Sequence, residues 1–173
     1  MDIVGKTIWQ VAAGDTNRNF VDLCLKWDVI LNGPGSAGPW PDCIESLRKE
    51  LKLSEKKIDD LRRFCEVIKD GDIVLLRLGT ADIFGVGLVV GQYEWKDEFS
   101  DVDGWDLQHV RRVRWLWKYE KNSKKFDPYT LKFGDTAQTI DSDEIKKWIS
   151  QIVVDDEALN KPLAQIPIYE SDS

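Results

Sequence analysis

The chain has 173 residues, of which 42% are hydrophobic and 32% are charged. This length and composition favour one soluble globular domain with a sizeable core. No apolar run approaches the roughly 20 residues of a membrane span, and the N-terminus lacks the basic and apolar regions of a signal peptide. Cys24, Cys43 and Cys65 are odd in number and have no C-x-x-C spacing, which favours reduced, buried thiols in a cytoplasmic protein.

The net charge of −7 argues against a simple nucleic-acid coat protein. The charge is unevenly distributed: residues 111–125 contain seven basic residues and one acid, so they carry +6, while the rest of the chain carries −13. A basic patch of this kind can bind phosphates at one place, with strong salt dependence. A solvated, lysine-rich hairpin fits the same pattern equally well.

The first half of the chain alternates between short apolar runs and helical patterns. In chain order we expect a strand at residues 7–12, a helix at 17–27, a strand at 28–32, a Gly- and Pro-rich loop at 33–41, and helices at 42–51 and 54–68. Asp15 or Thr16 would cap the first helix.

The second half is richer in strand signals. In chain order we expect a hairpin of strands at 73–78 and 83–90, a long bent strand at 105–117, an extended piece at 129–133 and a helix at 142–152. In the long strand Val110 breaks the alternation of Leu107, Val113, Trp115 and Trp117, so a β-bulge near His109 is expected.

The order β-α-β-α-α-β-β-β-α lacks a sustained βαβα alternation. It predicts an α+β fold: a small, strongly coiled β-barrel of five to six strands with helices packed outside. Residues 1–154 would form this domain, and residues 155–173 would be a tail or linker.

No known catalytic or metal-binding pattern is evident. His109 is the only histidine, nothing links it to a cysteine, and it is expected to be structural. P-loop, dinucleotide-binding and zinc-protease motifs are absent. Asp42, Glu50 and Lys52 imitate a metal-dependent nuclease pattern, but they fall in a predicted helix with a charged surface. We therefore expect a non-enzymatic domain without cofactor or metal.

The stretch 103–117 (DGWDLQHVRRVRWLW) combines three tryptophans with three arginines. Indole rings stack on nucleobases and guanidinium groups bind phosphates, so this composition suits recognition of an unpaired or flipped base. A tryptophan-rich core strand with a charged outer face is the alternative. The predicted base-binding pocket consists of Gly14, Asp15, Leu31, Asn32, Gly33, Trp40, Leu78, Thr80, Trp105 and Asp106. The predicted phosphate-binding residues are Arg111, Arg112, Arg114, Lys118, Lys124 and Lys125.

Five segments carry a family resemblance: residues 8–15 (IWQVAAGD), 27–35 (WDVILNGPG), 72–77 (DIVLLR), 86–91 (VGLVVG) and 103–115 (DGWDLQHVRRVRW). Together they resemble the EVE/YTH-like branch of the PUA superfold, and most closely the N-terminal domains of McrB-type modification-dependent restriction proteins. The resemblance covers roughly residues 6–118.

This resemblance implies a pseudo-barrel whose pocket takes a flipped, often methylated, base of DNA. It also implies a GTP-driven motor domain and a nuclease subunit as partners, and no membrane association. The aromatic cage of YTH domains does not carry over, because Ile30 stands where that cage has a tryptophan; Trp105 is the remaining cage candidate.

The alternatives are an RNA-binding module of the same superfold, a nuclease acting by itself, and a protein-interaction domain whose tryptophans are all core.

Overall fold

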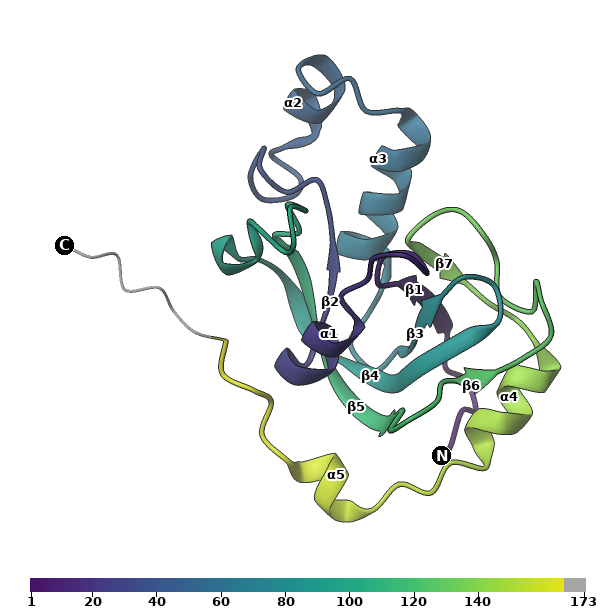
Figure 1. Cartoon of the computed structure of the whole chain (residues 1–173). Coiled ribbons are helices and arrows are strands. Elements are labelled where there is room, and N and C mark those ends of the chain that lie inside the picture. Colours follow the sequence, from purple (N-terminus) through teal and green to yellow (C-terminus); the bar gives the residue numbers. More distant parts are fainter. Residues whose placement is uncertain (167–173) are drawn as a thin grey trace.

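A computed structural model describes residues 1–166 of the chain (Figure 1). The fold is α+β, as predicted, and is built on one seven-stranded sheet. The strands are β1 (Ile8–Ala12), β2 (Val29–Asn32), β3 (Ile73–Leu78), β4 (Asp82–Trp95), β5 (His109–Lys118), β6 (Lys124–Lys125) and β7 (Ala137–Thr139). The α-helices are α1 (Val21–Trp27), α2 (Ile44–Lys49), α3 (Glu55–Arg62), α4 (Asp143–Ser150) and α5 (Asp156–Asn160).

The strand order is β2-β5-β4-β3-β1-β7, with β6 added beside β4. Only β1 and β3 run parallel, and the other pairs are antiparallel. The expected closure into a five- to six-stranded barrel is not found: within residues 1–166 the hydrogen-bonded path ends at β2 and β7, which do not pair. Strands β6 and β7 have two and three residues, too short to give a periodic sequence signal.

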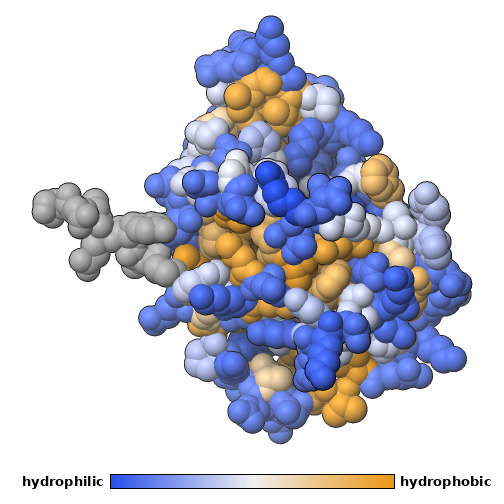
Figure 2. All heavy atoms as spheres, in the orientation of Figure 1, coloured by the Kyte–Doolittle hydropathy of each residue, from blue (hydrophilic) through white to orange (hydrophobic). Residues whose placement is uncertain are grey.

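Both faces of the sheet are covered, which explains why every residue at 73–78 is buried and all but Arg77 are apolar. Arg77 is 3% exposed and donates to the carbonyls of Gly79 and Asp135. Val74, Leu76 and Leu78 face the cluster formed with α1, α2 and α3, whereas Ile73 and Leu75 face α4. In Figure 1, α1 crosses the front of the sheet, α2 and α3 stand at the top, and α4 lies beside β6. The same view in Figure 2 shows hydrophobic residues in the middle of this face, framed by hydrophilic ones.

The register between β4 and β5 shifts at two places. One shift lies near His109, as expected, where Val90 and Glu94 of β4 pair with Arg112 and Val110 of β5, although the extra residues are on β4. The other shift was not expected. In β4 and β5, Val86 pairs with Trp117 and the next residue, Gly87, pairs with Trp115, so the extra residue is Leu116. The bulge sends the two indoles to opposite faces: Trp115 joins the cluster below α1, and Trp117 packs on Trp148 of α4 with ring centroids 5.0 Å apart.

Two element boundaries also differ from expectation. Helix α1 begins at Val21 rather than near residue 17, because residues 14–19 close a turn in which Gly14 and Asn19 form a β-bridge. The long strand begins at His109 rather than 105, because Trp105 forms a tight backbone bridge with Val102. Helix α3 continues as a π-helical turn at Arg63–Val67, so the helix predicted at 54–68 is confirmed in extent.

The predicted tail begins with ordered structure. Helix α5 lies below β5 in Figure 1, and Ile166 packs into a cluster with Val29 and Leu31 of β2. The backbone N–H of Ala164 donates to the Asp28 carboxylate at 2.8 Å. Residues 167–173, the rest of the predicted tail, lie outside the described residues. Among residues 1–166, no helix combines the length and the apolar character that a bilayer crossing requires.

His109 is fully buried at the start of β5, where it joins two loops. Its Nε2 lies 3.1 Å from the carbonyl oxygen of Pro34, and its Nδ1 lies 2.5 Å from the Tyr93 hydroxyl. Because a carbonyl only accepts, Nε2 carries the proton and Nδ1 accepts from the tyrosine. Burial lowers the pKa of His109 from 6.5 to about 4.

This lowered pKa predicts acid sensitivity. Between pH 6.5 and 4 the unfolded chain binds a proton that the folded protein excludes, so stability is lost as pH falls through this window. Denaturant unfolding at pH 7.5 and pH 5 should show that the wild type loses about 2 kcal/mol more than His109→Gln over this interval. Equal losses in the two proteins would contradict a neutral, buried imidazole.

Candidate functional site

A pocket of about 440 Å³ lies where β1 and β2 end and where the loops enter β5 and β7. This volume is within the range of small-molecule sites, about 300–1,000 Å³. We call it the Trp105 pocket. It is lined by Ala12, Gly14, Phe20, Leu31, Asn32, Gly33, Pro34, Lys57, Trp105, Asp106, Leu107, Gly134 and Thr136.

Trp105 forms one wall and is half-buried rather than sealed in the core. The Phe20 ring meets it edge-on, with centroids 5.4 Å apart and planes at 74°. The guanidinium carbon of Arg18 lies 3.7 Å from the centre of the indole. At Gly14, φ is +98°, and an added Cβ would lie 2.5 Å from the Arg18 carbonyl oxygen and 3.2 Å from the indole, so only glycine fits there.

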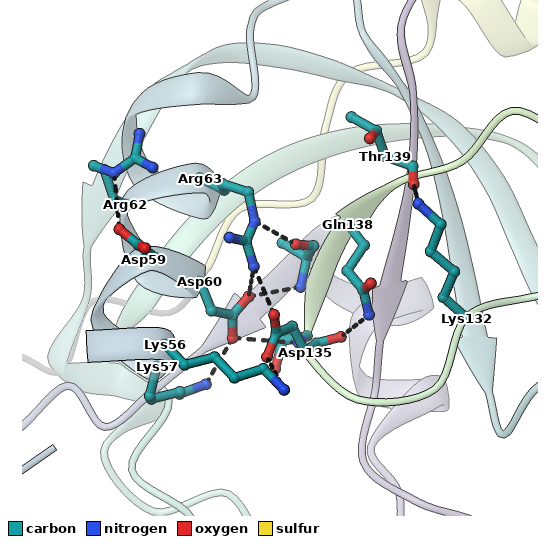
Figure 3. A network of polar contacts seen from close by, with 12 residues as sticks. Lys56, Lys57, Asp59, Asp60, Arg62, Arg63, Lys132, Asp135, Gln138 and Thr139 are labelled. Atoms are coloured by element: carbon teal, nitrogen blue, oxygen red, sulfur yellow. Dashed lines mark hydrogen bonds and ion pairs between the residues drawn. The ribbon is translucent and has the colours of Figure 1, made fainter. Parts of the chain in front are cut away.

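The floor of the pocket is polar. The Lys57 ammonium donates to Asn32 Oδ1 and to Asp60 Oδ2, both at 2.9 Å. Asp60 is completely buried and also accepts the backbone N–H groups of Thr136, at 3.2 Å, and Ala137, at 2.8 Å. Figure 3 shows this carboxylate between Lys57 and Arg63, so one charge joins α3 to the start of β7.

Asn32 leaves one donor unused. Its Oδ1 accepts from the backbone N–H of Gly33, at 2.9 Å, and from Lys57. Because both neighbours are donors, the oxygen must face them and the amide nitrogen must point the other way. Asn32 is 2% exposed, and within the described residues its Nδ2 has no hydrogen-bond partner. A buried, unpaired N–H group costs about 1–3 kcal/mol, and a ligand acceptor would recover this energy.

Asp106 supplies an acceptor on the opposite rim. Its carboxylate accepts the backbone N–H of Ser36 at 3.1 Å, which ties the loop after β2 to the segment before β5. The two segments touch so closely that a Cβ on Gly33 would lie 2.1 Å from the Asp106 carbonyl oxygen. The pocket therefore presents an aromatic wall, an amide donor, an ammonium and a carboxylate.

Six of the ten residues predicted for the pocket line it: Gly14, Leu31, Asn32, Gly33, Trp105 and Asp106. The other four do not. Trp40 is a core residue whose indole N–H donates to Glu66 at 2.7 Å, and Leu78 is buried in the same cluster. Thr80 lies on the turn between β3 and β4, where its hydroxyl accepts the backbone N–H of Tyr129. Asp15 caps the turn outside the pocket, where the backbone N–H groups of Arg18 and Asn17 hold the pKa of its carboxyl below the usual range.

Arg111 was predicted to contact phosphates, and this is wrong because the side chain is 2% exposed. Its guanidinium donates to the carbonyls of Phe64 and Ile68, at 3.0 and 2.5 Å, and to that of Gly91, at 3.2 Å. These carbonyls include those left free at the end of the π-helical turn, so Arg111 caps a helix inside the protein. Burial lowers its pKa.

Arg114 and Lys118 line a second cavity of about 440 Å³, at the C-terminal end of α1. We call it the basic groove; its charged residues are Lys26, Asp28, Arg114, Lys118 and Lys161. Arg114 donates to the carbonyl of Lys161, and Lys118 donates to that of Leu25 at 3.1 Å. Arg112 is held by three carbonyls, the shortest bond being 2.6 Å to Ala164.

Lys124 and Lys125 form β6 and do not extend the basic groove. Lys124 lies over the rings of Phe126 and Trp148, beside α4. The six predicted phosphate-binding residues thus separate into a buried arginine, a group beside the C-terminal segment and a pair beside α4. The sequence patch does not form one continuous surface.

The nuclease-like pattern does not converge. Asp42 and Glu50 lie at opposite ends of α2 and both are exposed. Within residues 1–166, no group of three His, Cys, Asp or Glu side chains is placed to hold a metal ion. His109 is structural, as predicted, since its two ring nitrogens are bonded to Pro34 and Tyr93.

A scan of protein families matches residues 9–142 to a domain of unknown function, DUF8426. The chain belongs to the DUF8426 family. A search of curated proteins finds no match. The matched range contains every residue that lines the Trp105 pocket, whereas α4 and α5 lie beyond it. The pocket thus lies within the matched range, and the C-terminal segment that walls the basic groove lies outside it.

Lys57 and Phe20 line the pocket but were not among the residues predicted for it. Lys57 directly precedes the buried Ile58 on α3, and Asp60 directly precedes the buried Leu61. A Lys-x-x-Asp pair beside the apolar positions of this helix was the one sequence pattern that could have indicated the ion pair, although such pairs are usually solvent-exposed. Phe20 lies just before α1 and packs against the core as well as lining the pocket.

The contact between Gly33 and Asp106 gives a structural prediction. Gly33→Ala would force apart two segments that wall the pocket, and overpacking of this kind lowers the free energy of unfolding by about 1–3 kcal/mol. Thermal and denaturant unfolding would measure the change, with the exposed Ser36→Ala as the control on the same loop. If Gly33→Ala is as stable as Ser36→Ala, the close approach described here is incorrect.

Proposed function

We propose that this domain is a non-catalytic nucleic-acid reader that accepts one extruded base in the Trp105 pocket. Base flipping requires a recess with a ring for stacking and a few fixed polar groups for the base edge. The pocket offers Trp105 and Phe20 as rings, Asn32 and Lys57 as donors, and Asp106 as an acceptor. The unpaired amide donor of Asn32 is the observation that carries this proposal.

The donor and acceptor groups suit the edge of a base better than an apolar ligand. Every nucleobase combines ring nitrogens or carbonyl oxygens, which accept, with N–H groups, which donate. A lipid or hydrocarbon would leave the amide donor of Asn32 unpaired, at an energetic cost. A flat heterocycle also matches the indole wall, since base–aromatic stacking contributes about 1–3 kcal/mol per base.

The phosphates that flank the base would be bound by the basic groove, which carries four cations and one carboxylate on a protein of net charge −7. Helix α1 separates the two cavities and has seven residues, so it is about 10 Å long. Arg114 and Lys118 are the predicted phosphate ligands that remain available there. Local binding of this kind would be weak and strongly salt-dependent.

We further propose duplex DNA carrying a modified base as the target, and a role as the specificity domain of a modification-dependent restriction system. The EVE- and McrB-like segments support this proposal, because they include the ends of β1 and β2 and the Trp105 loop that wall the pocket. A motor domain and a nuclease subunit would then be the partners. A PUA-like ancestry is part of the same proposal.

Trp105→Ala should weaken binding of a duplex with one unpaired base about 5- to 150-fold, because the stacking wall is lost. Fluorescence anisotropy at low salt would measure this. The control is Trp27→Ala, which removes another half-buried indole, on α1 and outside the pocket. Unchanged binding by Trp105→Ala, or an equal loss in both variants, would remove Trp105 from the site.

Asn32→Asp should weaken binding at least about 10-fold while the protein stays folded. The carboxylate keeps both acceptor roles toward Gly33 and Lys57 but replaces the free donor by an acceptor, and sites built to hydrogen-bond a ligand reject such changes strongly. Gln151→Glu, at the end of α4, makes the same change of charge away from the pocket. Full binding by Asn32→Asp would exclude the amide as a base contact.

Competition between substrates separates the remaining alternatives. We expect a panel of duplexes with single modified bases to compete more strongly than unmodified duplex or single-stranded RNA. Preference for the RNA would favour an RNA-binding module, and failure to bind any nucleic acid at low salt would favour a protein-interaction domain. Cleavage of plasmid DNA with Mg²⁺ by the purified chain would contradict a non-catalytic role.

A further inference from the structure

The segment at residues 161–166 is bonded to two arginines of β5. In Figure 1 this segment belongs to the yellow chain that rises from α5. Arg114 donates to the carbonyl oxygen of Lys161, and Arg112 donates to that of Ala164 at 2.6 Å. Lys161 and Ala164 also line the basic groove. Two backbone carbonyls of the segment therefore take positions on the guanidinium groups that phosphate oxygens could take.

Both arginines are bonded to neutral acceptors. Arg112 donates to three backbone carbonyls and Arg114 to one. Within residues 1–166, neither guanidinium forms an ion pair. A guanidinium binds an ionised phosphate more strongly than a neutral carbonyl, because the bond is charge-assisted and two N–H groups can donate at once. A phosphate is thus a better partner for Arg112 and Arg114 than the segment is.

The segment itself is held by few contacts. Of residues 161–166, only Ile166 is buried, in the cluster with Val29 and Leu31. The backbone N–H of Ala164 donates to the Asp28 carboxylate at 2.8 Å. Helix α5, which precedes the segment, has five residues and buries none of them. A region with so few buried apolar contacts opens locally at a much lower free-energy cost than the unfolding of the domain.

We propose that residues 161–166 are an internal competitor of phosphate: the segment occupies Arg112 and Arg114 in the free protein, and phosphates of the DNA backbone displace it. This inference rests on the proposed function, which places phosphates in the basic groove, and it adds Arg112 to their ligands. Because binding requires the open arrangement, the affinity for DNA backbone is reduced in proportion to the fraction of molecules that are open. The segment would therefore limit binding to DNA that offers no base to the Trp105 pocket.

Ile166→Ser in the full chain tests the competitor, because it removes the one buried side chain that anchors the segment. The probe is a fully paired, unmodified duplex, which can engage the groove but offers no extruded base. We expect about 5- to 10-fold tighter binding by Ile166→Ser at low salt, measured by fluorescence anisotropy. Val153→Ser is the matched control, since Val153 is 91% exposed, and it should bind as the wild type does.

Amide hydrogen exchange reports the position of the segment directly. Exchange of residues 161–166 should be faster in Ile166→Ser than in the wild type, and it should become faster in the wild type when the duplex is bound. Ala164→Pro provides a second way to release the segment, because it removes the N–H that donates to Asp28.

Arg112→Ala separates competition from a general loosening of the protein. In the Ile166→Ser background it should weaken duplex binding about 5- to 10-fold, because a phosphate contact is lost. In the wild type it should weaken binding less, because it removes a phosphate contact and a contact of the closed segment together. This non-additivity is the expected sign of competition for the same guanidinium.

Release of the segment with unchanged or weaker duplex binding would overturn the competitor, and so would equal effects of Arg112→Ala in the two backgrounds. If Trp105→Ala still weakens binding of a duplex with an unpaired base in that case, the proposed function stands without the competitor. If Ile166→Ser gains affinity but Trp105→Ala loses none, phosphate competition stands and base reading fails. If neither the wild type nor Ile166→Ser binds any duplex at low salt, both proposals fail.

Discussion

The buried carboxylate of Asp60 is the interaction on which the pocket depends. A charge without solvent must be paired, and Asp60 is paired with the ammonium of Lys57 and with two backbone N–H groups at the start of β7. These bonds fix three parts at once: the position of α3, the segment at residues 134–136 that forms one rim, and the lysine at the floor. Lys57 in turn fixes the amide of Asn32. Removing one partner of such a buried pair typically costs about 3–5 kcal/mol, so the pocket is maintained by the same charge that holds the fold together.

This arrangement prepares the pocket before any ligand arrives. The acceptor side of Asn32 is used by the protein, so within the described residues its donor is left unpaired, and Asp106 is held by the loop after β2. Because these groups are already fixed, little binding free energy is spent on ordering them when a ligand arrives. Such preorganisation lets a small site be specific. Polar groups that are fixed in advance in this way are suited to selecting a base by its edge.

The sequence predicted the α+β class, the strands β1 to β5 within a few residues, and six residues of the pocket, because each depended on local patterns: apolar runs, glycines and the ends of strands. It failed where distant segments decide. Arg111 and Arg114 lie on the same strand among similar neighbours in the sequence. Arg111 is nevertheless buried, because the π-helical turn after α3 packs against it and offers free carbonyl oxygens to its guanidinium. Trp40 and Trp105 are both flanked by Gly, Pro or Asp, but Trp40 is buried in the core whereas Trp105 lines the pocket. The open sheet was also unpredictable, since closure depends on whether β2 meets the very short β7.

The central claim is that a base enters the pocket and accepts a hydrogen bond from Asn32. The most direct measurement is the side-chain amide NMR signal of Asn32 during titration with a duplex that carries one unpaired modified base. The account predicts a saturable shift of this signal, together with slower exchange of its protons with water, while the amide of Gln151 stays unchanged. A saturated complex in which the Asn32 amide does not shift, or shifts no more than that of Gln151, would contradict it.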